Sequence, residues 1–203
     1  QIVPPFKMVV NRIHYDEYHI YPVGRHLLRT VMLLKQIKDL QNGNGDALAA
    51  ELWAEVKSKK LLLWGALLHD IAKTPCLKSG CNHAKVGGEL CRSLGFPEIA
   101  DIVAGHVFLS DFAPARYEQG IFFAQEIVYY ADKRVLHDKI VSLRERRDYI
   151  LEKYSCGDAR RQEGIRDNFR KCKELEKQIF SLLPFPPEQL GPKTAQRAFV
   201  LPA

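Results

Sequence analysis

The chain has no long apolar run, although 46% of its 203 residues are hydrophobic. A membrane-spanning helix needs about 20 consecutive apolar residues, so the sequence predicts no transmembrane segment and no membrane partner. The first ten residues, QIVPPFKMVV, also lack the basic start, the apolar run and the small-residue cleavage site of a signal peptide. The default expectation is therefore a cytoplasmic protein.

Cysteines are few, odd in number and loosely spaced, at Cys76, Cys81, Cys91, Cys156 and Cys172. This pattern argues against a disulfide scaffold and predicts free thiols in a reducing compartment. A second interpretation is a zinc site of the form C-x4-C-x-H, made by Cys76, Cys81 and His83. Structural zinc needs four ligands, and the obvious fourth is absent unless Cys91 folds back.

Strand-like alternation of apolar and polar residues is also absent, and no internal repeat is visible. Helical spacing of apolar residues is present along most of the chain. We expect loops at residues 74–82 and 110–120. Helices are predicted at residues 6–13, 21–40, 47–60, 61–71, 83–95, 97–109, 121–153 with a break near His137, 160–183, and briefly in the tail.

The fold class that follows is all-α, in one domain. Residues 1–160 form the helical bundle in this interpretation, and residues 161–203 form a C-terminal helical extension and tail packed on it. The segment 61–71 is apolar on almost every side, which is typical of a central buried helix. A homo-oligomer is possible.

The formal net charge of +6 favours anionic partners such as nucleotides, phosphorylated proteins or nucleic acid. Basic residues concentrate in residues 133–153, which could bind nucleic acid. However, Leu136, Ile140, Leu143 and Ile150 recur at helical spacing, and acidic residues are interleaved with the basic ones. A solvated amphipathic helix is the preferred interpretation of this segment.

The stretch LLLWGALLHDIAKTP, residues 61–75, places polar residues at the end of an apolar helix. Successive residues of a helix differ by about 100° in direction, close to the angle of about 90° between adjacent ligands of an octahedral ion. His69 and Asp70 could therefore bind one metal ion as neighbouring ligands. Imidazole supplies a borderline nitrogen, and carboxylate supplies a hard oxygen.

Further candidate ligands lie at or near the ends of other predicted helices or within an apolar one: His26, His83, His106 and Asp132. A single histidine is more often an ordinary hydrogen-bonded residue than a ligand. A buried aspartate is more often part of an ion pair, and Lys133 or Arg134 could be the partner of Asp132. The ordered set across five helices is much more specific than any one of its members.

The local sequence around these residues resembles the motifs of the HD-domain metal-dependent phosphohydrolases. LLLWGALLHDIAK is similar to that family's LLHDIGK motif, and GRHLLRTVMLL resembles its first-histidine helix. NHAKVGGELCRSLGFP resembles its H-x-x-x-G-A-E segment, and IVYYADKRV contains its YADK motif. The resemblance covers residues 14–135, and YHIYPVGRHLLRTV is also similar to the HD domain of bacterial uridylyl-removing enzymes.

This resemblance implies a compact helical bundle around a metal centre. The family ligands correspond to His26, His69, Asp70 and Asp132. In the members with two metals, His83 and His106 match the additional ligands, and Asp70 bridges the ions. The mixed donor set favours Mn²⁺, Fe²⁺, Co²⁺ or Ni²⁺ over Mg²⁺ and Zn²⁺.

The activity that we expect is hydrolysis of a phosphomonoester or phosphodiester, in a nucleotide or nucleotidyl compound, by metal-activated water. Asp70 would hold and deprotonate the water. Lys73 could contact a phosphate oxygen, or it could be a solvated lysine at the helix end, and Lys133 or Arg134 could also touch phosphate. The alternatives are a regulatory nucleotide-binding module with an HD fold, and a nucleic-acid-binding protein or nuclease that uses residues 133–153.

Overall fold

The computed structural model describes residues 56–137 and 139–195, and the single positions 24, 26–28, 30–32, 34 and 54. The helix predicted at residues 6–13 and most of the one at 47–60 lie outside the described residues. The chain divides into two compact units, Gln1–His106 and Val107–Ala203, and each is presented by itself. No helix in the described ranges combines the length and the apolar character needed to cross a bilayer.

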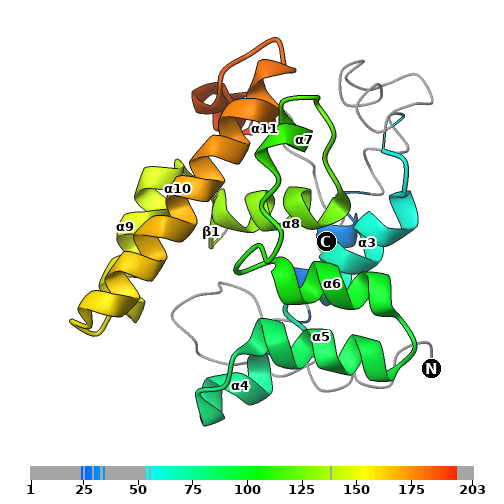
Figure 1. The fold of residues 1–203 in the computed structure, drawn as a ribbon, viewed down its shortest axis with the longest axis vertical. Helices are drawn as coiled ribbons and strands as arrows, with labels where there is room; N and C mark the ends of the chain where they lie inside the picture. Colours follow the sequence, from blue (N-terminus) through cyan, green and yellow to red (C-terminus); the bar gives the residue numbers. More distant parts are fainter. Residues whose placement is uncertain are drawn as a thin grey trace. The chain divides into compact units, whose positions relative to one another are not determined.

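The described part of the first unit consists of helices joined by short turns. The described positions from 24 to 34 are helical, as the sequence predicts. They are followed by α3 (Lys59–Leu68), α4 (Lys73–Ser79), α5 (His83–Ser93) and α6 (Pro97–Gly105). α5 and α6 pack side by side, and α3 also packs on α6 (Figure 1).

Glycines let the helices of this unit approach one another closely. A Cβ atom on Gly88 would lie 2.9 Å from the Cβ of Ala104 and 3.0 Å from the carbonyl oxygen of Ala100. α5 therefore packs against the backbone of α6, with no space for a side chain at this point. The apolar core next to this contact consists of Leu27, Leu68, Ile71, Cys91, Ile99, Ala100 and Val103.

The prediction of a loop at residues 74–82 is wrong over most of that range, because α4 occupies residues 74–79. Pro75 favoured the loop prediction, but proline is tolerated within the first turn of a helix, where backbone N–H groups have no partner inside the helix. Gly80 is the C-cap of α4 with a φ of 70°, a left-handed conformation that glycine adopts without strain. The turn after α4 is thus very short, and α5 begins at His83.

The second unit contains short and long helices and one small hairpin. Its elements are α7 (Pro114–Tyr117), α8 (Ala124–Lys133), β1 (Val135–Leu136), β2 (Lys139–Ile140), α9 (Leu143–Tyr154), α10 (Ala159–Ser181), the 3₁₀ helix η3 (Pro187–Gln189) and α11 (Leu190–Ala195). α9 and α10 pack side by side (Figure 1). A second apolar core, which includes Tyr117, Tyr129, Phe169 and Leu175, lies inside this unit.

The predicted break near His137 is confirmed, and its form was not predicted. β1 and β2 pair in antiparallel fashion, with Val135 opposite Ile140. His137 adopts a φ of 58° at the turn between them. The all-α class is nevertheless confirmed, since the two strands have only two residues each. The boundary near residue 160 stays a prediction, although α10 begins close to it.

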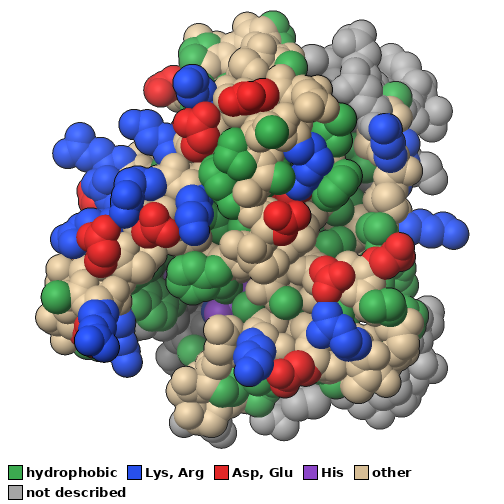
Figure 2. Space-filling model, in the orientation of Figure 1, with side chains coloured by type: hydrophobic (Ala, Val, Ile, Leu, Met, Phe, Trp, Pro, Cys, Tyr) green, Lys and Arg blue, Asp and Glu red, His purple; other side chains and the backbone are tan. Residues whose placement is uncertain are grey.

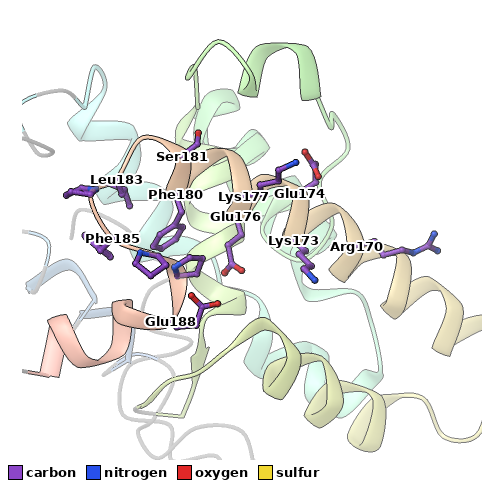
Figure 3. A pocket seen from close by; sticks show the side chains of 13 residues that line it. Arg170, Lys173, Glu174, Glu176, Lys177, Phe180, Ser181, Leu183, Phe185 and Glu188 are labelled. Carbon is purple, nitrogen blue, oxygen red and sulfur yellow. The ribbon is translucent and has the colours of Figure 1, made fainter.

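An open cavity of about 780 Å³ lies at the C-terminal end of α10 in the second unit. Phe180 and Phe185 are among its apolar lining residues, and Lys173 and Glu176 line it from α10 (Figure 3). Three basic and three acidic residues line it in all. This balance of charge selects no class of ligand.

Candidate metal centre

His69 and Asp70 lie where α3 ends. His69 is the C-cap residue of that helix, and its Nδ1 lies 2.9 Å from the carbonyl oxygen of Ala66. A carbonyl oxygen can only accept, so Nδ1 carries the proton and donates it. The second ring nitrogen, Nε2, then keeps its lone pair, which is the arrangement that a metal-binding histidine needs.

His106 repeats this arrangement at the end of α6. It is the C-cap residue of α6, and its Nδ1 donates to the carbonyl oxygen of Val103 at 2.6 Å. Its side chain is 1% exposed. A fixed tautomer in a buried ring again directs a lone pair on Nε2 toward neighbouring groups.

His83 is the first residue of α5. Asn82 caps that helix, and its side-chain oxygen accepts a hydrogen bond from the backbone N–H of Lys85 at 3.1 Å. Nε2 of His83 lies 3.2 Å from Nε2 of His106. Two ring nitrogens that approach this closely require a proton or a cation between their lone pairs.

The carboxylate of Asp70, which is buried, faces both sides of this histidine cluster. Oδ1 lies 3.3 Å from Nε2 of His83 and 3.5 Å from Nε2 of His106. Oδ2 lies 3.8 Å from Nε2 of His69 and accepts a hydrogen bond from Nζ of Lys73 at 2.9 Å. Oδ1 therefore faces His83 and His106, whereas Oδ2 faces His69 and Lys73.

Two groups of possible ligand atoms share Asp70. One is His26, His69 and Asp70, and the other is Asp70, His83 and His106; in each, the ligand atoms lie within 4.8 Å of one another. Imidazole nitrogen together with carboxylate oxygen suits a divalent first-row transition metal. The cluster could therefore hold a divalent metal, and the identity of that metal stays a prediction.

Charge around Asp70 matches this arrangement. Burial by itself would raise the pKa of its carboxyl, because burial disfavours the charged form. The positive charge of Lys73, together with His69, His106 and His83, instead holds the pKa well below its usual range. The carboxylate is therefore ionised at neutral pH, as a metal ligand must be.

Asp132 belongs to the second unit, near the end of α8, and is partly exposed. That Asp132 binds a metal together with His26, His69 and Asp70 stays a prediction. The next residue, Lys133, is buried, with Nζ 3.7 Å from the centre of the Tyr129 ring.

Arg134 is buried and bonded within the second unit. It donates to the carbonyl oxygen of Val141 through Nε at 2.7 Å, to Glu176 through Nη1 at 2.7 Å and to the carbonyl oxygen of Pro187 through Nη2 at 3.0 Å. These contacts give Arg134 a structural role. A phosphate contact from Lys133 or Arg134 stays a prediction.

The basic surface of residues 133–153 is interleaved with acidic groups. Arg144 and Arg147 of α9 both pair with Asp148, at 3.9 Å and 2.7 Å. Figure 2 shows Lys and Arg side chains predominating over α9 and α10, with Asp and Glu side chains among them. The acidic groups that pair with basic ones on α9 favour the solvated amphipathic helix over a nucleic-acid interface.

The prediction that all cysteines are free is wrong for two of them. Cys76 and Cys81 form a disulfide, with Cα atoms 4.7 Å apart, while Cys91, Cys156 and Cys172 are free. The turn at Gly80 brings Cys81 back toward the last turns of α4. The zinc interpretation is wrong for the same reason, since both sulfurs are bonded to each other and cannot ligate zinc. The sequence offered one signal for this bond, namely two cysteines five residues apart with Gly80 between them.

A helical protein with a buried cluster of imidazoles and a shared carboxylate is the class that this geometry defines. The chain belongs to the HD domain family: the model of that family, described as HD domain, matches residues 23–143, more than half of the chain. This family comprises metal-dependent phosphohydrolases, which supports a metal-dependent hydrolase in general terms.

Curated relatives are large bacterial proteins named bifunctional uridylyltransferase/uridylyl-removing enzyme. The chain is 32% identical to that of Gluconobacter oxydans (strain 621H) over 125 residues, which is 57% of this chain and 13% of the relative. It is 33% identical to that of Novosphingobium aromaticivorans over 115 residues, 54% of this chain and 13% of the relative. The chain thus spans about one eighth of the length of these relatives. No solved structure matches the chain.

Proposed function

We propose that this chain is a metal-dependent phosphohydrolase that cleaves a phosphomonoester or phosphodiester bond of a nucleotide or nucleotidyl compound. The observation that carries the proposal is the carboxylate of Asp70, whose two oxygens face two different groups of histidines. A shared carboxylate of this kind is suited to bridging two divalent ions. We assign His26 and His69 to one ion and His83 and His106 to the other, with Asp132 as a further ligand.

A divalent ion in this place supplies Lewis acidity, which lowers the pKa of a water molecule and offsets charge on phosphoryl oxygens. The chain's own residues have separate proposed tasks. Asp70 orients the attacking water and accepts its proton. The low pKa of Asp70 makes it a weak base, so orientation is the larger part of this task.

Lys73 is the proposed phosphate-binding residue. Its ammonium group lies 2.9 Å from Oδ2 of Asp70, and its side chain is 15% exposed. A lysine on a flexible stem can reach from this carboxylate to a phosphate oxygen as a mobile point charge. The mixed nitrogen and oxygen donors favour Mn²⁺, Fe²⁺, Co²⁺ or Ni²⁺ in this proposal.

The test is an assay of the Mn²⁺-reconstituted chain with bis(4-nitrophenyl) phosphate, 4-nitrophenyl phosphate, and a panel of nucleotides and cyclic dinucleotides. We expect turnover of at least one of these esters. Asp70→Asn should reduce kcat/KM by about 100-fold or more, because it removes the charge of the shared ligand. Metal content, measured by mass spectrometry of the eluted protein, should fall in the same variant.

Asp101→Asn is the matched control. Asp101 lies on α6, and its exposed carboxylate pairs with Arg92 at 2.7 Å. The same change of charge there should leave metal content and turnover unchanged. Metal binding without turnover of any ester would favour a regulatory nucleotide-binding module. Activity only on polynucleotides would favour a nuclease.

A further inference from the structure

The Cys76–Cys81 disulfide connects α4 to the start of α5. Cys76 lies on α4, one turn beyond Lys73, and Cys81 lies two residues before His83. Only residues 80–82 separate the two helices. The bond therefore restrains the short segment that leads directly into His83, the first residue of α5.

His83 depends on this restraint more than the other histidines of the cluster do. Its side chain is 27% exposed, whereas that of His106 is 1% exposed. Carbonyl oxygens accept from Nδ1 of His69 and of His106, and among the residues that the structure describes no carbonyl does so for His83. The place of His83 is thus set by the first turn of α5, where the segment restrained by the disulfide ends.

We propose that the Cys76–Cys81 disulfide positions His83, and that its reduction by a dithiol weakens cation binding by Asp70, His83 and His106. The other group, His26, His69 and Asp70, keeps its affinity, because His26 lies at a helical position before α3 and His69 is the C-cap residue of α3. This inference rests on the proposed function only in requiring that the cluster bind metal. The disulfide then acts as a redox control on one half of the centre.

The bond is open to such a reductant at one end. Cys81 is exposed, whereas Cys76 is 5% exposed. One thiolate of the dithiol attacks Sγ of Cys81, and the sulfur–sulfur bond breaks with Cys76 leaving as a thiolate that takes up a proton. The second thiol of the reductant then closes its own disulfide and releases Cys81 as a thiol. Two electrons and two protons pass from the dithiol to the protein.

The experiment titrates Mn²⁺ into the full chain in oxidised form and after reduction by dithiothreitol, with the reductant removed without air. Alkylation followed by mass spectrometry reports the state of the bond. Electron paramagnetic resonance of free Mn²⁺ measures how much metal is bound. We expect one class of site to lose about tenfold or more in affinity on reduction and the other to stay unchanged.

Variants separate positioning from general stability. Cys76→Ser/Cys81→Ser should bind Mn²⁺ like the reduced chain without any reductant, and Cys156→Ser, which alters an exposed free thiol, should behave like the wild type. In His83→Ala, reduction should have no further effect. If the double variant does not fold, the reduced wild type and His83→Ala still decide the question.

Three results would overturn the inference: equal Mn²⁺ affinities in both redox states, equal weakening of both classes of site, or a redox effect that persists in His83→Ala. Identical alkylation of the two preparations would overturn it as well. Binding of Mn²⁺ that ignores the redox state contradicts this inference alone. Absence of Mn²⁺ binding in both states contradicts the proposed function too.

Discussion

Nε2 of His83 lies 3.2 Å from Nε2 of His106, although the two residues are 23 positions apart in the sequence. α5 begins with the first of them, and α6 ends at the second. The close packing of these two helices brings the two rings together. Oδ1 of Asp70 lies near both nitrogens, so this side of the cluster is ready to accept a positive charge.

The tautomers of the cluster are directly testable. Because Nδ1 of His69 and of His106 each donates to a carbonyl oxygen, both rings should carry their proton on Nδ1 in the metal-free protein. Long-range ¹⁵N–¹H NMR spectra should show Nδ1–H for both. Addition of Zn²⁺ as a diamagnetic probe should shift the Nε2 resonances and leave the Nδ1 resonances nearly in place. Protonation on Nε2 of either ring would contradict the ligand assignment.

Gly88→Ala should disturb the packing of α5 on α6. The new methyl group would meet the backbone oxygen of Ala100, which cannot rotate away as a side chain can. We expect the free energy of unfolding to fall by about 1–3 kcal/mol, measured by urea denaturation. The fitted Mn²⁺ affinity should fall as well, because His83 and His106 would move apart.

Gly164→Ala is the matched control for that change. Gly164 lies within α10, and a Cβ atom there would meet nothing within 4 Å. Alanine is the better helix former, so this variant should gain about 0.5–1 kcal/mol of stability. Equal effects of the two substitutions would show that a methyl group at position 88 fits between α5 and α6 without displacing them.

Glu126→Ala should be among the most destabilising single changes in the second unit. Glu126 is 1% exposed; it accepts hydrogen bonds from Arg116 and from the backbone N–H of Phe123, which precedes α8. Removing it leaves a partly buried guanidinium and an N–H group without their acceptor. We expect a loss of about 3 kcal/mol in the free energy of unfolding.

An exposed ion pair provides the comparison for Glu126. Glu163 accepts a hydrogen bond from Arg170 at 2.8 Å on the surface of α10, and both side chains are about two-thirds exposed. Glu163→Ala should cost less than about 1 kcal/mol, because water screens such a pair. Similar losses in the two variants would mean that the Arg116–Glu126 pair is not buried.

Lys133 should make the stability of the protein depend on pH. Burial lowers the pKa of Lys133 from 10.5 to about 8, although Asp132 opposes the shift. Below pH 8 the lysine is charged in both the folded and the unfolded chain, and the cost of burying that charge is complete. Above pH 8 the folded chain releases the proton first, so the stability contributed by this residue rises with pH up to its unfolded pKa.

Lys133→Met tests this effect, because methionine is uncharged at every pH and so removes the titrating ammonium group from the buried position. Between pH 7.5 and 10, the stability of the wild type should rise by about 2 kcal/mol relative to that of the variant. Urea denaturation at several pH values measures the difference. A constant difference across this range would show that Lys133 has an ordinary pKa in the folded protein.

The positions of many helices could be predicted from the spacing of apolar residues and from the residues that begin or end a helix. The apolar run before His69 predicts the buried helix that became α3, and Gly95 with Pro97 marks the junction between α5 and α6. The prediction failed where local signals conflict. Pro75 and Gly80 favour a loop in isolation, yet they are compatible with the start and the end of a short helix, and only the surrounding structure selects that alternative.

The sequence predicted which residues of the candidate site could bind a metal, but it did not predict how their side chains are arranged. Residue type alone identified His69, Asp70 and the other histidines as possible ligands. Which oxygen of Asp70 faces which ring depends on the side-chain conformation, and the bond between Cys76 and Cys81 depends on the turn at Gly80. Neither follows from spacing along the chain.

The sequence by itself determined the fold class, the kinds of donor atoms and the order in which they occur, because helical periodicity and ligand chemistry are properties of neighbouring residues. Only the tertiary structure decided that His83 meets His106 and that Asp70 lies between two histidine groups. The reason is that side chains from separate helices converge only where those helices pack, and here the distance between α5 and α6 is set by glycines at their contact.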